Sequence, residues 1–79
     1  MDEMPYKGYL IEATPEQLAE SGEWAIRVCI WRDRGSHTNE KIYSAGNRFK
    51  TEEEAIPRCF EFGKQVIDGK IANCTVDDL

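Results

Sequence analysis

Few side chains in this sequence have the chemistry that catalysis or metal binding requires. The chain has 79 residues and one histidine, His37, which could act as a general base or as a metal ligand. Its neighbours are polar, and no second histidine exists to complete a metal site. These features favour a solvated loop residue, so we predict no metal site and no cofactor.

The three cysteines, Cys29, Cys59 and Cys74, also lack a pattern that indicates chemistry. They lie 30 and 15 residues apart, whereas metal-binding cysteines usually come in close pairs. A secreted disulfide scaffold would hold more cysteines, in an even number. A nucleophilic cysteine paired with the histidine stays open on sequence alone. Since no assembled set of nucleophile and base is visible, we predict reduced thiols in a cytoplasmic protein that is not an enzyme.

Three consecutive glutamates, Glu52 to Glu54, could bind a cation, but the start of a helix explains them better. Thr51 and Glu54 have the spacing of a capping box, in which the threonine hydroxyl accepts a hydrogen bond from the Glu54 amide. Apolar residues then recur at helical spacing until Gly69, which can end the helix in a left-handed conformation. Pro57 lies about one turn into this helix and predicts a kink or a frayed first turn.

Alternating apolar and polar residues predict three strands ahead of this helix. The clearest runs from Trp24 to Arg32, where one set of alternate side chains is wholly apolar and should face the core. A first strand is predicted from Tyr6 to Ala13, and the segment 15–20 could form one helical turn after it. A third strand is predicted from Lys41 to Phe49, in which Gly46-Asn47 would mark a bulge.

These elements predict an α+β fold in the order βββα: a three-stranded antiparallel meander with one C-terminal helix packed on one face. The chain should form a single domain over residues 1–79, with an ordered core over about 6–71 and an acidic tail over 72–79. A chain this short buries only about 60% of the surface that its unfolded form exposes. The residues expected in the core are Tyr9 or Leu10, Ile11, Trp24, Ile26, Val28, Ile30, Tyr43, Phe49, Ala55, Ile56, Cys59, Phe60, Val66 and Ile67.

Charge is distributed unevenly along the chain. The stretch from Trp24 to Lys50 holds six basic residues and two acidic ones, whereas the whole chain has a net charge of −5. A sheet built from this stretch could present a cationic surface. The acidic balance of the whole chain argues against a dedicated nucleic-acid binder, which is usually basic. No segment approaches the ~20 apolar residues that span a membrane.

One helix can cover only one face of the sheet, so the other face is the main candidate for function. Tryptophan and arginine often dominate the energy of protein interfaces, which favours binding of a protein partner or of a second copy. Nucleic-acid binding is the alternative, with arginines on phosphates and an aromatic ring stacked on a base. A half-solvated face without a binding role also stays open. The predicted interaction residues are Arg27, Trp31, Ile42 and Arg48, and the alternative nucleic-acid contacts are Lys7, Arg27, Arg32, Arg34 and Lys41.

The order of three segments resembles the plant APETALA-type DNA-binding domain and its relatives in phage integrases. The segments are Tyr6-Lys7-Gly8, Trp24 to Val28 and Phe49 to Ala55. The resemblance implies a three-stranded sheet that enters the major groove, with Arg27 in the place of a DNA-contacting arginine and Lys7 in that of a basic residue on the first strand. The long acidic first loop and the negative net charge depart from that family.

The same order of segments also resembles small bacterial domains of unknown function, a likeness that implies no activity. Taken together, these observations predict a small bacterial, cytoplasmic module that binds a protein partner or itself through the outer face of its sheet.

Overall fold

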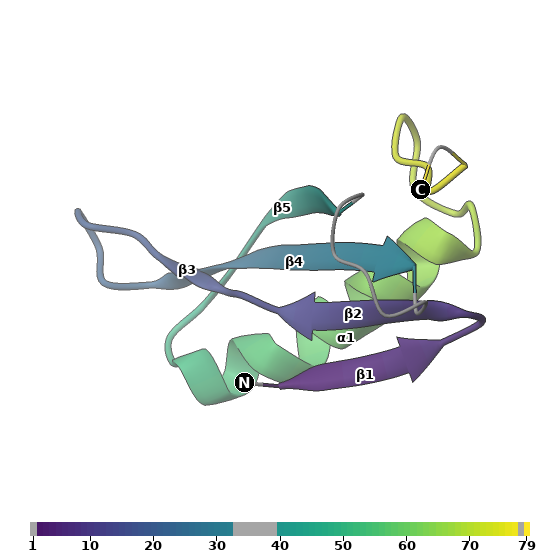
Figure 1. Cartoon of the computed structure of the whole chain (residues 1–79). Helices are drawn as coiled ribbons and strands as arrows, with labels where there is room; N and C mark the ends of the chain where they lie inside the picture. Colours follow the sequence, from purple (N-terminus) through teal and green to yellow (C-terminus); the bar gives the residue numbers. More distant parts are fainter. Residues whose placement is uncertain (1, 33–39, 78) are drawn as a thin grey trace.

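The computed structural model describes residues 2–32, 40–77 and 79 (Figure 1). One antiparallel sheet carries a single helix on one face, so the predicted α+β class is confirmed. The sheet has five strands, however, and the expected three-stranded meander is wrong. The elements are β1 (Glu3–Tyr6), β2 (Tyr9–Ala13), β3 (Glu16–Gln17), β4 (Trp24–Arg32), β5 (Lys41–Phe49) and α1 (Glu52–Ile67). Within the described ranges, no helix is long and apolar enough to cross a membrane.

The segment that was predicted as a single first strand forms a hairpin instead. Lys7 and Gly8 have positive φ angles of 50° and 86°, and Tyr6 lies opposite Tyr9 across the turn. A two-residue loop with positive φ at both positions matches the twist of the strands it joins. The usual sequence signal for such a loop is Asn-Gly or Asp-Gly, and its absence here explains why the turn was not predicted.

The connection that was predicted to contain a helical turn contains a short strand. Glu16 and Gln17 form β3, which pairs with the first two residues of β4. Strands β2 and β3 therefore lie along the same edge of β4, separated by Thr14 and Pro15. Proline has no N–H to donate to the ladder, so the pairing is interrupted there. The amide of Thr14 still donates to the carbonyl oxygen of Arg27 over 2.9 Å.

The two long strands have the bounds that the alternation predicted. Between them, Ile26 lies opposite Ala45 while Ala25 lies opposite Arg48, which confirms the bulge at Gly46-Asn47. Because the bulge adds two residues, the alternation of faces continues through it. Strand β5 pairs with β4 along one edge, and no described strand pairs with its other edge.

Helix α1 begins and ends where its caps predict. The Glu54 amide donates to the Thr51 hydroxyl over 3.2 Å, and this hydroxyl lies 3.2 Å from the Glu54 carboxylate. Gly69 follows the helix with a φ of 76°. Pro57 lies inside a continuous helix that starts at Glu52, so the expectation of a frayed first turn is wrong.

The core lies between α1 and the face of the sheet that carries the even-numbered residues of β4. Phe62, not Phe60, is the buried aromatic residue of the helix, and Phe60 packs half-buried against the core cluster. Val76 is buried as well, so the core extends past the expected limit at residue 71 into the acidic tail. The core cluster consists of Ile11, Ala13, Ile26, Val28, Ile30, Tyr43, Cys59, Phe62, Val66 and Val76.

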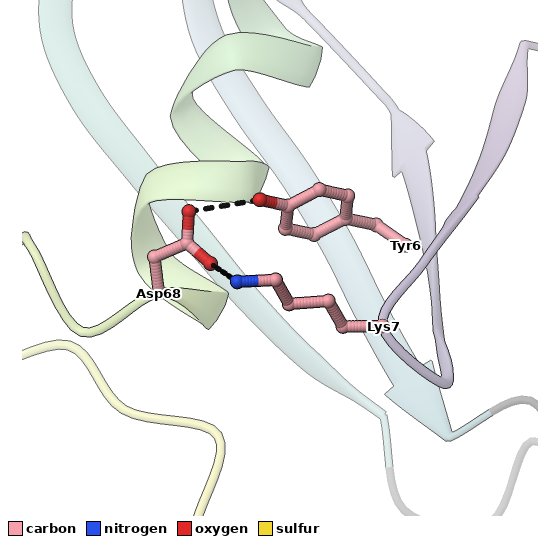
Figure 2. A network of polar contacts seen from close by, with 3 residues as sticks. All are labelled: Tyr6, Lys7 and Asp68. Atoms are coloured by element: carbon pink, nitrogen blue, oxygen red, sulfur yellow. Dashed lines mark hydrogen bonds and ion pairs between the residues drawn. The ribbon is translucent and has the colours of Figure 1, made fainter.

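A polar contact fastens the β1–β2 turn to the end of α1 (Figure 2). The Tyr6 hydroxyl and the Lys7 ammonium donate to the two carboxylate oxygens of Asp68 over 2.9 Å and 2.6 Å. The hydrogen bonds from Lys7 and then Tyr6 lower the pKa of the Asp68 carboxyl. The contact therefore stabilises the fold at pH values above the ordinary carboxyl pKa of about 3.9, and this contribution is lost as the pH falls through the lowered value.

Gly63 of the helix lies against the Ile11 side chain of β2. A Cβ atom at this position would lie 2.7 Å from Cγ2 of Ile11, whose side chain is fully buried. We expect Gly63→Ala to lower the free energy of unfolding, because an overpacking cost of about 1–3 kcal/mol exceeds the gain of up to ~1 kcal/mol that alanine brings to a helix. Denaturant unfolding measures the change. In the control Gly46→Ala the new methyl group meets no atom within 4 Å, and equal stability of the two variants would contradict this packing.

Candidate functional site

The sheet face opposite α1 was predicted to expose Trp31, and this prediction is wrong. Ile26, Val28 and Ile30 belong to the core beneath the helix, so alternation directs Trp31 to the opposite face. Its side chain is nevertheless only 3% exposed. The expectation treated the face without a helix as open to solvent. A central strand also has neighbours on both sides, and Leu10 of β2 lies directly opposite Trp31.

Arg27 lies on the same face and makes polar contacts with Thr14 and Glu16. Its Nε atom donates to the carbonyl oxygen of Thr14 over 2.9 Å. Its guanidinium also lies 3.8 Å from the Glu16 carboxylate. These contacts bridge the interruption between β2 and β3, where the proline leaves the ladder incomplete. Arg27 thus supports the sheet where β2 and β3 are interrupted, and its side chain stays partly accessible.

The other two predicted interaction residues, Ile42 and Arg48, are exposed and lie on β5. Ile42 is 67% exposed, and it is the large apolar side chain that stands out in solvent among the described residues. The Arg48 guanidinium lies 3.8 Å from the Glu23 carboxylate, with more than half of its side chain accessible. The exposed part of the predicted face is thus concentrated on one strand.

Two carboxylates near Cys29, on the outer face of the sheet, were missed by the sequence analysis. Cys29 of β4 lies between Glu12 of β2 and Ile42 of β5, and its thiol donates to Glu40 over 3.2 Å. Glu12 follows from the alternation of its strand, whereas the position of Glu40 depends on where β5 begins. The outer face around Cys29 therefore carries two carboxylates, whereas Arg27 and Arg48 lie on the same face toward the Trp24 end of β4.

The same arrangement makes Cys29 a poor nucleophile. Burial raises the pKa of its thiol to about 12, with further increases from the hydrogen bond to Glu40 and from the charges of Glu40 and Glu12. The reactive form of cysteine is the thiolate, and at neutral pH this thiol stays protonated. Burial likewise raises the pKa of the Cys59 thiol.

The residues predicted as nucleic-acid contacts do not share one surface. Arg27 points away from the helix, whereas Lys41 lies opposite Ile30 on the helix side of the sheet. Lys7 is bound to the carboxylate at the end of α1. Arg34 lies outside the described residues, as does His37.

Arg32, the remaining predicted nucleic-acid contact, is hydrogen-bonded to the last residue of the C-terminal tail. Its guanidinium lies 4.8 Å from the centre of the Tyr9 ring. Its Nε atom donates to the carbonyl oxygen of Leu79 over 2.8 Å. Arg27 and Arg32 of the middle stretch therefore make separate contacts within the fold.

The described parts of the chain contain no group of three or more His, Cys, Asp or Glu side chains that could hold a metal ion. The model of a protein family described as a domain of unknown function (DUF6566) matches residues 1–77. The chain belongs to the DUF6566 family. No curated protein and no solved structure matches this DUF6566 chain. The predicted likeness to a small domain of unknown function is confirmed. None of these comparisons indicates that the chain binds DNA.

The burial of the three thiols predicts the order in which they react with an alkylating reagent. Cys29 and Cys59 are buried and Cys74 is half-buried, so we expect iodoacetamide at neutral pH to modify Cys74 first. The other two should react only after the protein is unfolded, and peptide mass spectrometry distinguishes the three sites. Modification of Cys29 in the folded protein at the rate of Cys74 would contradict the site described above.

Proposed function

We propose that this domain binds another protein through β5, at a surface that we call the β5 patch. The patch consists of the exposed outer-face side chains Ile42, Ser44 and Arg48. The proposal rests mainly on Ile42, the apolar residue of the patch. Complete burial of a large aliphatic side chain by a partner would contribute roughly 1.5–3 kcal/mol to the binding free energy. Single exposed apolar residues are common on proteins, so the proposal also depends on where Ile42 lies.

Ile42 lies on a strand whose outer edge is suited to receive another strand. Strand β5 has nine residues and no proline, and no described strand pairs with its outer edge. The opposite edge of the sheet, β1, has four residues and carries Pro5 together with an exposed Glu3. Short length, proline and charge are the features that block added strands. An incoming strand is therefore expected to pair with β5, where backbone hydrogen bonds give affinity and side-chain contacts give specificity.

Strand β5 also has features that make such pairing selective. Lys41, Arg48 and the bulge at Gly46-Asn47 interrupt what would otherwise be a uniform edge. Charges and bulges of this kind discourage indiscriminate edge-to-edge association. A partner strand must place an acidic or polar side chain opposite Arg48 and leave room for Ile42. These requirements favour one specific protein partner over general adhesion.

The substitution Ile42→Lys tests this function. We expect a tagged wild-type protein to capture its partner from a lysate of its native host, and Ile42→Lys to reduce that capture by about tenfold or more, since tenfold corresponds to ~1.4 kcal/mol. Quantitative mass spectrometry compares the two, and circular dichroism checks that both are folded.

The matched control is Gln65→Lys, which makes the same change of charge at an exposed position on α1. Capture that depends on neither substitution, or that both substitutions reduce equally, would contradict a function at the β5 patch.

A further inference from the structure

We infer that the partner reaches β5 as an extended segment and places a tyrosine side chain in a cavity between β5 and α1. This inference rests on the proposed function and adds the chemistry of the partner. A strand added to the outer edge of β5 would direct alternate side chains to the outer face and to the helix side of the sheet. Pockets for such alternate side chains give an added strand its specificity.

The helix side of the sheet has a pocket of this kind, which we call the α1–β5 cavity. It has a volume of about 140 Å³, and its walls come from β4, β5 and α1: Ile26, Asn47, Arg58, Glu61, Phe62 and Gln65. The four polar residues of this set are exposed. The cavity therefore opens to solvent beside β5, a strand with no described partner on its outer edge.

The local structure explains why the cavity forms between these two elements. Its α1 residues recur at helical spacing, which places them on one side of the helix. On that side, the Arg58 guanidinium lies 5.7 Å from the centre of the Phe49 ring of β5, so this side of α1 faces β5. Asn47 supplies the wall from β5. It belongs to the bulge, between the β5 residues that pair with Ile26 and with Ala25.

The size and the walls of the α1–β5 cavity suit one aromatic ring with a polar end. Ile26 and Phe62 are buried apolar residues and form its floor. An apolar cavity of roughly 150 Å³ takes up one benzene molecule, and Phe62 offers a partner for aromatic packing. The amides of Asn47 and Gln65 lie at the rim, where they can donate and accept hydrogen bonds. A tyrosine side chain meets both conditions, because its ring is apolar and its hydroxyl donates and accepts.

The charges at the rim favour a neutral occupant. Arg58 and Glu61 carry opposite charges and both line the cavity. A carboxylate in the cavity would be repelled by Glu61, and an ammonium would be repelled by Arg58. Tyrosine is uncharged at neutral pH, because the ordinary pKa of its hydroxyl is about 10. Its ring can also receive the Arg58 guanidinium over one face.

The side chain of tyrosine as a free molecule, p-cresol, tests the cavity. We expect p-cresol to bind with a Kd on the order of 1 mM, and the largest shifts in an amide NMR spectrum to centre on Asn47, Arg58 and Phe62. Gln65→Trp puts a large ring at the rim and should weaken this binding by about tenfold or more. The matched control Gln17→Trp makes the same exchange at an exposed position on β3 and should bind p-cresol as the wild type does. Circular dichroism confirms that both variants are folded.

The capture control Gln65→Lys leaves the α1–β5 cavity open. It exchanges one unbranched side chain for another, whose charged end stays in water. We expect this variant to bind p-cresol as the wild type does, which separates the effect of a ring at the rim from that of a charge.

A library of random heptapeptides displayed on phage tests the occupant. Selection on the wild-type protein, with counter-selection on Gln65→Trp, should enrich tyrosine at one position of the peptides. A synthetic peptide of a selected sequence should lose about tenfold in affinity when its tyrosine is replaced by alanine. It should also bind more weakly to Ile42→Lys, because the same added strand contacts the outer face.

The outcomes separate this inference from the proposed function. Binding of p-cresol that Gln65→Trp weakens, together with tyrosine in the selected peptides, supports the inference. No binding of p-cresol, shifts centred elsewhere, binding that Gln65→Trp leaves unchanged, or a selection that does not enrich tyrosine overturns it. If one of these occurs while Ile42→Lys still abolishes capture of a protein partner, the proposed function stands without the tyrosine. If neither the peptides nor the captured proteins depend on Ile42, both proposals fall.

Discussion

The burial of β4 on both of its faces is the constraint on which the rest of this structure depends. Val28 and Ile30 are fully buried beneath α1, while Cys29 and Trp31 are almost fully buried on the opposite side. The strand is also paired along both edges, with β2 and β3 on one side and β5 on the other. A small domain has one limited core, and here that core is built around a single central strand. The surface left for recognition is therefore displaced from β4 to its neighbour β5.

The remaining polar contacts close the molecule around this strand. Arg27 joins β4 to the break between β2 and β3, and Arg32 joins its end to the carbonyl of Leu79. Asp68 ties the end of the helix to the first hairpin. Arg27 and Arg32 are thus held in contacts within the fold, whereas Arg48 on β5 stays more than half accessible. Glu40, next to Ile42 on the outer face, is exposed as well.

The parts of the fold that were predicted correctly have local signals, and the parts that were missed depend on distant neighbours. Alternation predicted the bounds of β4 and, despite the bulge at Gly46-Asn47, those of β5, and the capping residues predicted those of α1. Strand β3 forms because its two residues pair with the edge of β4. A strand of two residues is too short to show an alternating pattern in the sequence. The exposure of Ile42 followed from alternation on an edge strand. The burial of Trp31 could not be predicted, because alternation gives the face of a side chain and not what covers it.

The most direct test of this account is the accessibility of the Trp31 indole. In a Trp24→Phe variant, which leaves Trp31 as the single tryptophan, acrylamide quenching of fluorescence reports on that ring alone. The account predicts blue-shifted emission and quenching several-fold weaker, on the order of a buried indole, than in the same protein unfolded by guanidinium. Quenching as strong in the folded protein as in the unfolded one would show that the outer side of β4 is open to solvent, and would contradict the central position of this strand.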